Sequence, residues 1–337
     1  MSLVVAAPSV RIRRRSTRRS LRLPSASLAA MVALLITFGG TTATADESER
    51  HPDWQRREGI PRGEVTEHTH TTPGDAPIYP GTKRYFSVYK PAAMVDGTLE
   101  TPAALMVFLD GHAYVREGSE FNTPAVLDNL IAAGDIPPMV AVFIDPGFYE
   151  RQLEDGKLPE KRGWNPRPGN RSVEYDTVSD EYGRWLHETL LPAAYEAAGI
   201  DPPAVSINPL RRGLCGSSSG GICAFKVAWF NPSQFAIVIS HIGSFTDIRG
   251  GHNFPPMVRK EDKRPLRVVL QDGTGDLDNQ FGNWWLANQQ MAAALAFREY
   301  DHKTYWGEGG HNQTDGGRIF PDEMKWLWRD WRKFAEQ

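Results

Sequence analysis

Short apolar runs alternate with longer amphipathic segments along most of the chain. The continuous apolar runs at residues 104–109 and 139–144 are typical of strands that are covered on both faces of a sheet. Residues 85–89 have the alternating pattern of a half-buried strand. Further strands are predicted over residues 237–240, 266–270 and, from a weaker pattern, 303–306.

Segments with a helical spacing of apolar residues separate these strands. The predicted helices cover residues 123–133, 178–198, 219–230, 285–300 and 321–335. The last begins with Pro321, which suits the first turn of a helix, and two acidic residues follow it, as the helix dipole favours. Because strands alternate with helices, the sequence predicts an α/β fold with a mainly parallel sheet and helices on both faces.

Residues 1–45 differ from the rest of the chain. They hold seven arginines and no lysine or acid, then an apolar stretch at 28–38 and small residues ending in an Ala-x-Ala site at Ala45. This order predicts an export signal peptide. The apolar stretch is too short for a membrane span, which takes about 20 residues. The sequence TRRSL at 17–21 resembles a twin-arginine signal, with the general secretory route as the alternative. A disordered basic tail would not need the Ala-x-Ala site.

The remainder of the chain is acidic and rich enough in apolar residues to form a large core. Without the segment 1–45 it has 31 basic and 41 acidic residues, a formal charge of −10, which gives no reason to expect nucleic acid as a partner. We expect an exported protein, periplasmic or secreted, with no stable membrane anchor after signal removal. Residues 46–81 are predicted to be an irregular lead-in or a first edge strand, and 82–337 a single catalytic domain. Residues 147–170 are predicted to form a long loop of the kind that is often functional.

The strongest local signal is GSSSGG at residues 216–221, which contains Gly-x-Ser-x-Gly centred on Ser218. In a nucleophile elbow a strand turns sharply into a helix and exposes the serine, and the flanking glycines let the backbone pack closely. The following helix would direct the N–H of Ser219 at a reacting carbonyl, as an oxyanion-hole donor. A plain Gly/Ser turn is the alternative interpretation.

A base and an acid follow Ser218 in the expected order. A glycine-rich loop after the strand at 303–306 presents His311, and the loop after the strand at 266–270 presents acids. Both loops lie at the carboxyl ends of predicted strands, where active sites of open α/β sheets form. We expect Asp276 to orient His311, with Asp278 and Asp272 as alternatives whose carboxylates could instead cap turn N–H groups.

A second oxyanion donor is expected from the loop at 109–114, after the strand at 104–109. The N–H of His112 is the first candidate and that of Ala113 the next. The imidazole of His112 could instead line the pocket or be exposed.

Five segments together resemble the esterase-D-like esterases, the group that includes enterochelin esterases and the feruloyl and acetylxylan esterases of carbohydrate esterase family one. The segments are LMVFLDG at 105–111, GSSSGG at 216–221, the stretch 271–291, GEGGHN at 307–312 and FPDEMKWLWRDW at 320–331. The resemblance implies an α/β-hydrolase fold and a serine carboxylic-ester hydrolase without metal or cofactor. It implies Ser218 as nucleophile, Asp276 as acid and His311 as base.

The resemblance leaves the substrate open between iron-chelating catecholate lactones and aromatic or acetyl esters on plant polysaccharide. A small-molecule or carbohydrate-linked ester is therefore the expected partner. Arg171 could bind a substrate carboxylate or phenolate, or form an ion pair at a helix start. Phe281 and Trp284 are candidates to stack on a substrate ring. An acyltransferase and a non-catalytic binding module on the same fold are the alternative functions.

Two further features concern metal binding and disulfide formation. His68 and His70 would share one face of a strand, but no third metal ligand accompanies them, so we expect an exposed edge and no metal site. Cys215 and Cys223 flank the elbow and are expected to be buried thiols, with a disulfide after export as the alternative.

Overall fold

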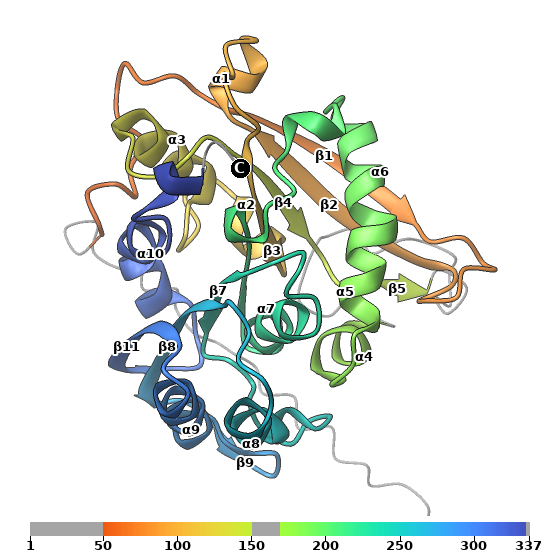
Figure 1. Ribbon diagram of the computed structural model, residues 1–337, viewed down its shortest axis with the longest axis vertical. Helices are drawn as coiled ribbons and strands as arrows, with labels where there is room; N and C mark the ends of the chain where they lie inside the picture. Colours follow the sequence, from red (N-terminus) through yellow and green to blue (C-terminus); the bar gives the residue numbers. More distant parts are fainter. Residues whose placement is uncertain (1–49, 150–168, 335–337) are drawn as a thin grey trace, which may run out of the picture. The chain divides into compact units, whose positions relative to one another are not determined.

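The computed structural model describes residues 50–149 and 169–334 (Figure 1). The predicted signal peptide at 1–45 and most of the predicted loop at 147–170 lie outside the described residues. Within them, no helix has the length and apolar character needed to cross a membrane.

A single large sheet organises the described residues, and its strand order is β1-β2-β4-β3-β6-β7-β8-β11, with β5 paired to β2. The strands β3, β4, β6, β7, β8 and β11 are parallel, whereas β2 runs antiparallel to both β1 and β4. Their bounds are β1 Glu64–Thr71, β2 Thr82–Lys90, β3 Ala104–Leu109, β4 Met139–Ile144, β5 Phe148–Tyr149, β6 Arg212–Ser217, β7 Ile237–His241, β8 Arg267–Gly275 and β11 Asp301–Gly310. The predicted mainly parallel sheet is confirmed, and the lead-in contains β1 as an edge strand.

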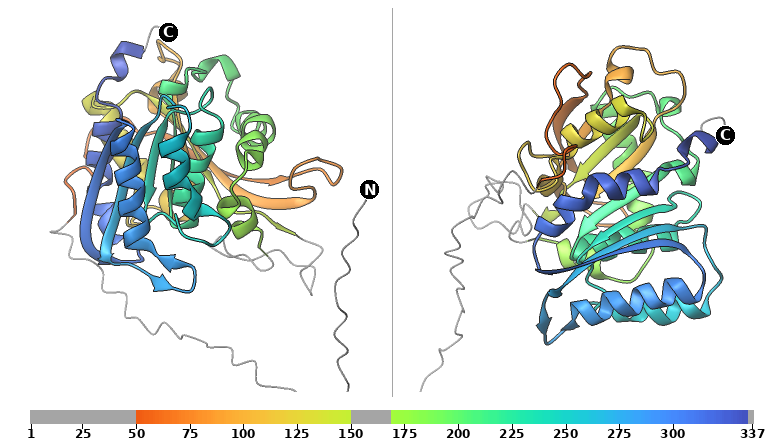
Figure 2. Two further views of the ribbon diagram at one scale, coloured as in Figure 1. Left: turned by 60° about the horizontal axis from the view of Figure 1, so that its bottom comes forward. Right: turned by 90° about the vertical axis from the view of Figure 1, so that its left-hand side faces the viewer.

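Helices cover both faces of this sheet (Figure 1). The longer ones are α3 Thr123–Ala133, α7 Ser219–Phe230, α9 Trp284–Phe297 and α10 Thr314–Leu327, and the shorter ones are α4 Arg171–Asp176, α5 Glu181–Trp185, α6 Leu191–Ala197 and α8 Phe254–Lys260. α3 and α10 pack on one face, and α5 to α9 pack on the other, each with its own apolar core. The right-hand view of Figure 2 shows the strands between α10 and α9. The parallel strands β3, β4, β6, β7 and β8 are therefore buried from both sides, as their apolar runs predicted.

Several predicted elements match the structure residue for residue, namely the strands at 104–109 and 139–144 and the helices at 123–133 and 219–230. The last helix does not. α10 begins at Thr314, seven residues before the predicted start, and Pro321 lies inside it. Its first turns pack so closely that an added Cβ on Gly317 would lie 2.5 Å from the carbonyl oxygen of Glu120. The tertiary packing of Gly317 therefore outweighs the local preference that predicted the start of the helix at Pro321.

The predicted helix at 178–198 is interrupted. It consists of α5, a π-helical turn at Leu186–Leu190 and α6. Pro192 stands in the first turn of α6, where its missing N–H leaves no hydrogen bond unmade inside that helix. The wider π turn lies just ahead of it.

Candidate active site

Ser218 lies at the turn between β6 and α7, with a backbone φ of 59°. Its N–H donates to the carbonyl of His241 over 2.9 Å, which ties the turn to the end of the neighbouring strand β7. An added Cβ on Gly216 would lie 2.4 Å from the backbone of Gly220. The two flanking glycines therefore permit the close approach that the sequence predicted for them.

The structure brings Ser218, His311 and Asp276 into one hydrogen-bonded chain. Nε2 of His311 lies 2.8 Å from Oγ of Ser218, and Nδ1 lies 2.6 Å from Oδ1 of Asp276. His311 follows the last residue of β11, and Asp276 follows the last residue of β8. The serine, the histidine and the acid thus meet at the carboxyl ends of parallel strands, where the sequence placed them.

The carboxylate of Asp276 is held in its ionised form. Its side chain is fully buried, while that of His311 is 22% exposed. Burial alone would raise the pKa of Asp276, but hydrogen bonds from His311 and Asp272 outweigh it and lower that pKa. The N–H of Leu277 also donates to Oδ1. A buried negative charge beside Nδ1 favours the tautomer in which Nε2 can accept a proton.

The alternative acids have other surroundings. Asp278 is exposed on the two-residue strand β9, Asp278–Asn279, where it pairs with Asn283 of the strand β10, Gly282–Asn283. Asp272 is fully buried beside Asp276, and no hydrogen bond joins it to His311 within the described residues.

Of the two predicted oxyanion donors, Ser219 lies at the start of a helix, as the sequence predicted. It is the first residue of α7, so its N–H has no acceptor inside the helix. The prediction for His112 conflicts with the structure, because the N–H of His112 donates to Oδ1 of Asp145 over 2.9 Å. The imidazole Nδ1 of His112 lies 3.0 Å from the same oxygen. The N–H of His112, which was expected to face the substrate, is therefore hydrogen-bonded to Asp145. The N–H of Ala113 donates to the carbonyl of Asp110.

A hollow of about 430 Å³ opens over the serine and the histidine. We call it the catalytic hollow, and its lining consists of Arg171, Ser217, Ser218, Ile242, His311, Asn312 and Gln313. Arg171, the first residue of α4, is therefore placed where the sequence expected a substrate contact. Its guanidinium donates to both oxygens of the buried Asp110, over 2.8 and 2.7 Å, and to Oγ of Ser219 over 3.0 Å. The ion pair is thus made with the strand end at Asp110, not within α4.

The two predicted aromatic contacts are not in this lining. Trp284 is only 3% exposed, and its indole packs edge-on against His311 with ring centroids 5.8 Å apart. Its Nε1 donates to Oγ of Ser244 over 3.0 Å, and that oxygen lies 3.3 Å from Oγ of Ser218. Trp284 is therefore a buried neighbour of His311 and Ser244, and not a residue that lines the catalytic hollow. Phe281 is exposed in the turn between β9 and β10. Ser244 has no motif around it that could have identified it from sequence.

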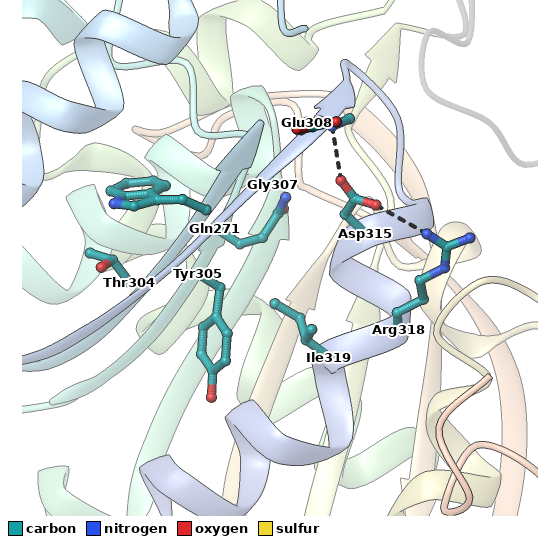
Figure 3. Close-up of a pocket in the computed structure, with 10 residues that line it drawn as sticks. Gln271, Thr304, Tyr305, Gly307, Glu308, Asp315, Arg318 and Ile319 are labelled. Atoms are coloured by element: carbon teal, nitrogen blue, oxygen red, sulfur yellow. Dashed lines mark hydrogen bonds and ion pairs between the residues drawn. The ribbon is translucent and has the colours of Figure 1, made fainter. Parts of the chain in front are cut away.

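A larger hollow, of about 720 Å³, has none of the three hydrogen-bonded residues in its lining (Figure 3). Figure 3 shows Asp315, on α10, between Arg318 and the main chain of β11. Residues from β8, β11 and α10 line it, among them Gln271, Tyr305 and Trp306. Volume alone would select this hollow, but its lining has no nucleophile with an adjacent base.

No group of three or more potential metal ligands is found within residues 50–149 and 169–334. His68 and His70 lie on the edge strand β1. Cys215 and Cys223 are both buried free thiols, as predicted, and burial raises the pKa of Cys223 to about 12.

Comparisons with known proteins agree on one family. Residues 79–336 match the family described as "Putative esterase". Over 252 residues the chain is 29% identical to the iron(III) enterobactin esterase of Dickeya dadantii (strain 3937). The matched segment covers 68% of this chain and 49% of that protein. The chain thus spans about half the length of this curated relative.

Solved structures show the same fold. The enterobactin esterase of Shigella flexneri superposes with a TM-score of 0.57 at 21% identity, covering 82% of this chain and 62% of that one. A ferulic acid esterase of the fungus Anaeromyces mucronatus superposes with a TM-score of 0.58 at 16% identity, covering 82% of this chain and 96% of that one.

Proposed function

Because the chain belongs to the esterase family that matches its residues 79–336, we propose that it is a serine carboxylic-ester hydrolase. Ser218 is the nucleophile, His311 the general base and Asp276 the acid that orients the histidine. The observation that carries this proposal is the continuous chain from Oγ of Ser218 through His311 to Asp276, with contacts of 2.8 and 2.6 Å. These are the distances that proton transfer between such groups requires.

The geometry supports a two-step reaction. Nε2 of His311 takes the proton of Ser218 as Oγ bonds to the ester carbonyl carbon, and the N–H of Ser219 stabilises the oxygen that becomes negative. The protonated His311 then gives its proton to the leaving alcohol, and the C–O bond of the ester breaks. Water repeats the sequence on the acyl-enzyme: His311 takes its proton, the acid is released and Ser218 recovers its hydrogen.

We propose that the substrates are aromatic, sugar-linked or siderophore-type esters. The support is that a relative of the chain is named as an iron(III) enterobactin esterase, and that a protein with the same fold is named as a ferulic acid esterase. In the catalytic hollow, Arg171 is the residue that would contact an oxygen-rich part of such a substrate.

We also propose export through the segment 1–45, and the composition of this segment supports the proposal. N-terminal sequencing of the protein from its native host would test the cleavage after Ala45.

Replacing the nucleophile tests the reaction directly. Ser218→Ala and His311→Ala should each lower kcat by about 10⁴- to 10⁶-fold, because the two groups act as a unit. A fluorophosphonate should label the wild type and leave Ser218→Ala unlabelled. Circular dichroism should show an unchanged fold. More than a few per cent of residual kcat in Ser218→Ala would remove it from the role of nucleophile.

A substrate panel of ferulate, acetyl-xylan, p-nitrophenyl and catecholate esters tests the substrate class, with Arg171 as the variable. Replacing Arg171 alone would leave Asp110 as an unpaired buried charge, so the informative variant is Arg171→Met with Asp110→Asn. Asparagine tolerates the left-handed backbone that Asp110 has at φ 57°. We expect KM to rise for the ferulate or catecholate ester and to change little for p-nitrophenyl acetate. An equal change for all esters would contradict a substrate contact.

A further inference from the structure

Asp272 is a carboxyl group of this site that the proposed reaction does not use. It lies on β8, four residues before Asp276, and it is fully buried. The N–H of Gly273 donates to its Oδ1 over 2.7 Å, and the side-chain amide of Asn288, on α9, donates to its Oδ2 over 2.7 Å. Asn288 is itself fully buried and donates to the carbonyl of Gly243 over 2.9 Å. These contacts hold the carboxyl group of Asp272 in one place.

The carboxyl groups of Asp272 and Asp276 lie within hydrogen-bonding reach of each other. Oδ1 of Asp276 accepts hydrogen bonds from His311 and Leu277. Its Oδ2 is buried, and within residues 50–149 and 169–334 no N–H or hydroxyl donates to it. An unsatisfied buried carboxylate oxygen is unfavourable, and the negative charge of one buried carboxylate opposes ionisation of a carboxyl group beside it. One proton held between the two groups resolves both difficulties.

We propose that Asp272 is a positioning residue for Asp276: as a neutral carboxylic acid it donates its O–H to Oδ2 of Asp276. The inference rests on the proposed function, because it assigns Asp272 a task in orienting the proposed base. With both oxygens engaged, the carboxylate of Asp276 cannot rotate away, and Oδ1 stays directed at Nδ1 of His311.

The charges around the pair support this placement of the proton. Burial, followed by the hydrogen bond and the charge of Asp276, raises the pKa of Asp272 to about 8. The pKa of Asp276 is lowered, so Asp276 carries the negative charge at neutral pH. The groups in contact with Asp272 besides Asp276 are the amide of Asn288 on α9 and the N–H of Gly273 on β8, neither of which titrates. His311 hydrogen-bonds to Asp276.

Above the pKa of Asp272, its proton is lost, Oδ2 of Asp276 loses its donor and a second negative charge repels the first. The wild-type kcat should therefore decline above about pH 8. Asp272→Asn removes the titration and keeps a neutral side chain whose amide can donate to Asp276. Its kcat at pH 7 should stay within about tenfold of the wild type, with a plateau that extends to higher pH. Asp272→Ala, which has no donor, should lose about 10- to 100-fold in kcat with little change in KM.

The matched control is Asp278→Asn, which removes an exposed acid from the same loop and should keep the wild-type decline. A decline above pH 8 that persists in Asp272→Asn would overturn the proposal. So would a wild-type kcat in Asp272→Ala, or an equal loss in the asparagine and alanine variants.

Infrared difference spectroscopy detects the proton on the carboxyl group of Asp272 independently of turnover. The wild type minus Asp272→Asn spectrum at pH 7 should contain the C=O stretch of a protonated carboxyl group, and this band should vanish from the wild type as the pH rises through about 8. A wild type without this band at pH 7 overturns the proposal, even if the alanine variant does not fold. Failure of the wild type to react with a fluorophosphonate would instead contradict the proposed function and leave the infrared result standing.

Discussion

Asp276 and Asp278 lie two residues apart, yet their side chains have different surroundings. Asp276 is buried against Nδ1 of His311, and Asp278 is exposed in a short hairpin. Asp276→Asn preserves the shape of the side chain but stabilises the wrong tautomer of His311, so we expect kcat to fall by roughly 10³- to 10⁴-fold. Asp278→Asn should cost less than about tenfold, because Asn suits an exposed turn equally well. Both variants are assayed on one chromogenic ester, and the reverse ranking would transfer the orienting role to Asp278.

Arg171 combines an ion pair with a place in the lining of the catalytic hollow. The sequence left open whether it contacts substrate or forms an ion pair. In the structure its guanidinium pairs with the buried Asp110 and also lines the catalytic hollow. The ion pair holds the guanidinium in a fixed orientation beside Ser219, and a fixed donor is what recognition of a planar carboxylate or phenolate requires.

At the scale of elements, the turn from β6 into α7 depends on two glycines. The Cβ of a Gly216→Ala variant would lie 2.4 Å from the backbone of Gly220, so one of the two segments must move. We expect the free energy of unfolding to fall by about 1–3 kcal/mol, and kcat to fall as Ser218 shifts from His311. Urea unfolding and ester hydrolysis measure the two effects.

Gly74→Ala is the matched control for this prediction. An added Cβ on Gly74 meets no atom within 4 Å, and its backbone does not require a left-handed conformation. Its stability and kcat should equal those of the wild type. If the two alanine variants behaved alike, the close approach of Gly216 to Gly220 would have no role in the fold or the reaction.

Helix α10 shows where local preferences mislead. Pro321 and the acids after it have the pattern of a helix start, but the helix begins at Thr314. Gly316 and Gly317, which are poor helix formers, pack against His241 and Glu120 from other parts of the chain. His241 lies 75 residues before Gly316 and Glu120 lies 197 residues before Gly317, so no local pattern could reveal these contacts.

At the scale of the whole molecule, the buried Asp272 makes stability depend on pH. Its pKa is raised to about 8, so between about pH 4 and pH 8 the folded protein holds a proton that the unfolded chain has released. The contribution of Asp272 to the free energy of unfolding must therefore fall as the pH rises through this interval. Asp272→Asn lacks this effect. The free energy of unfolding of the variant minus that of the wild type should therefore increase, by on the order of several kcal/mol, between pH 4 and pH 8.

Urea unfolding of the wild type and the variant at pH 4, 6 and 8 measures this difference. Asp278→Asn replaces an exposed acid, so its free energy of unfolding should equal that of the wild type at every pH. A difference between Asp272→Asn and the wild type that stayed constant with pH would show that Asp272 is ionised in the folded protein.

The fold class and the three residues that meet in one hydrogen-bonded chain were predictable from the sequence alone. Strands buried on both faces have continuous apolar runs, and an amphipathic helix has its own spacing, so β3, β4, α3 and α7 have the predicted bounds. The loops with Asp276 and His311 follow predicted strands, and the elbow motif predicts the strand-to-helix turn at Ser218. Parallel strands bring their carboxyl ends to one edge of the sheet. These features depend on neighbours in sequence, or on a rule that holds for every parallel sheet.

What surrounds those three residues was decided by tertiary structure. The N–H of His112 donates to Asp145, the rings of Trp284 and His311 form a T-shaped contact, and Asp272 lies beside Asp276. Each contact joins segments whose approach depends on how helices and strand ends pack in three dimensions. A hydrogen bond is sensitive to tenths of an ångström, whereas a sequence pattern specifies only which residues share a face or an end. The pattern therefore determines which side chains reach the site, and packing determines which of them touch.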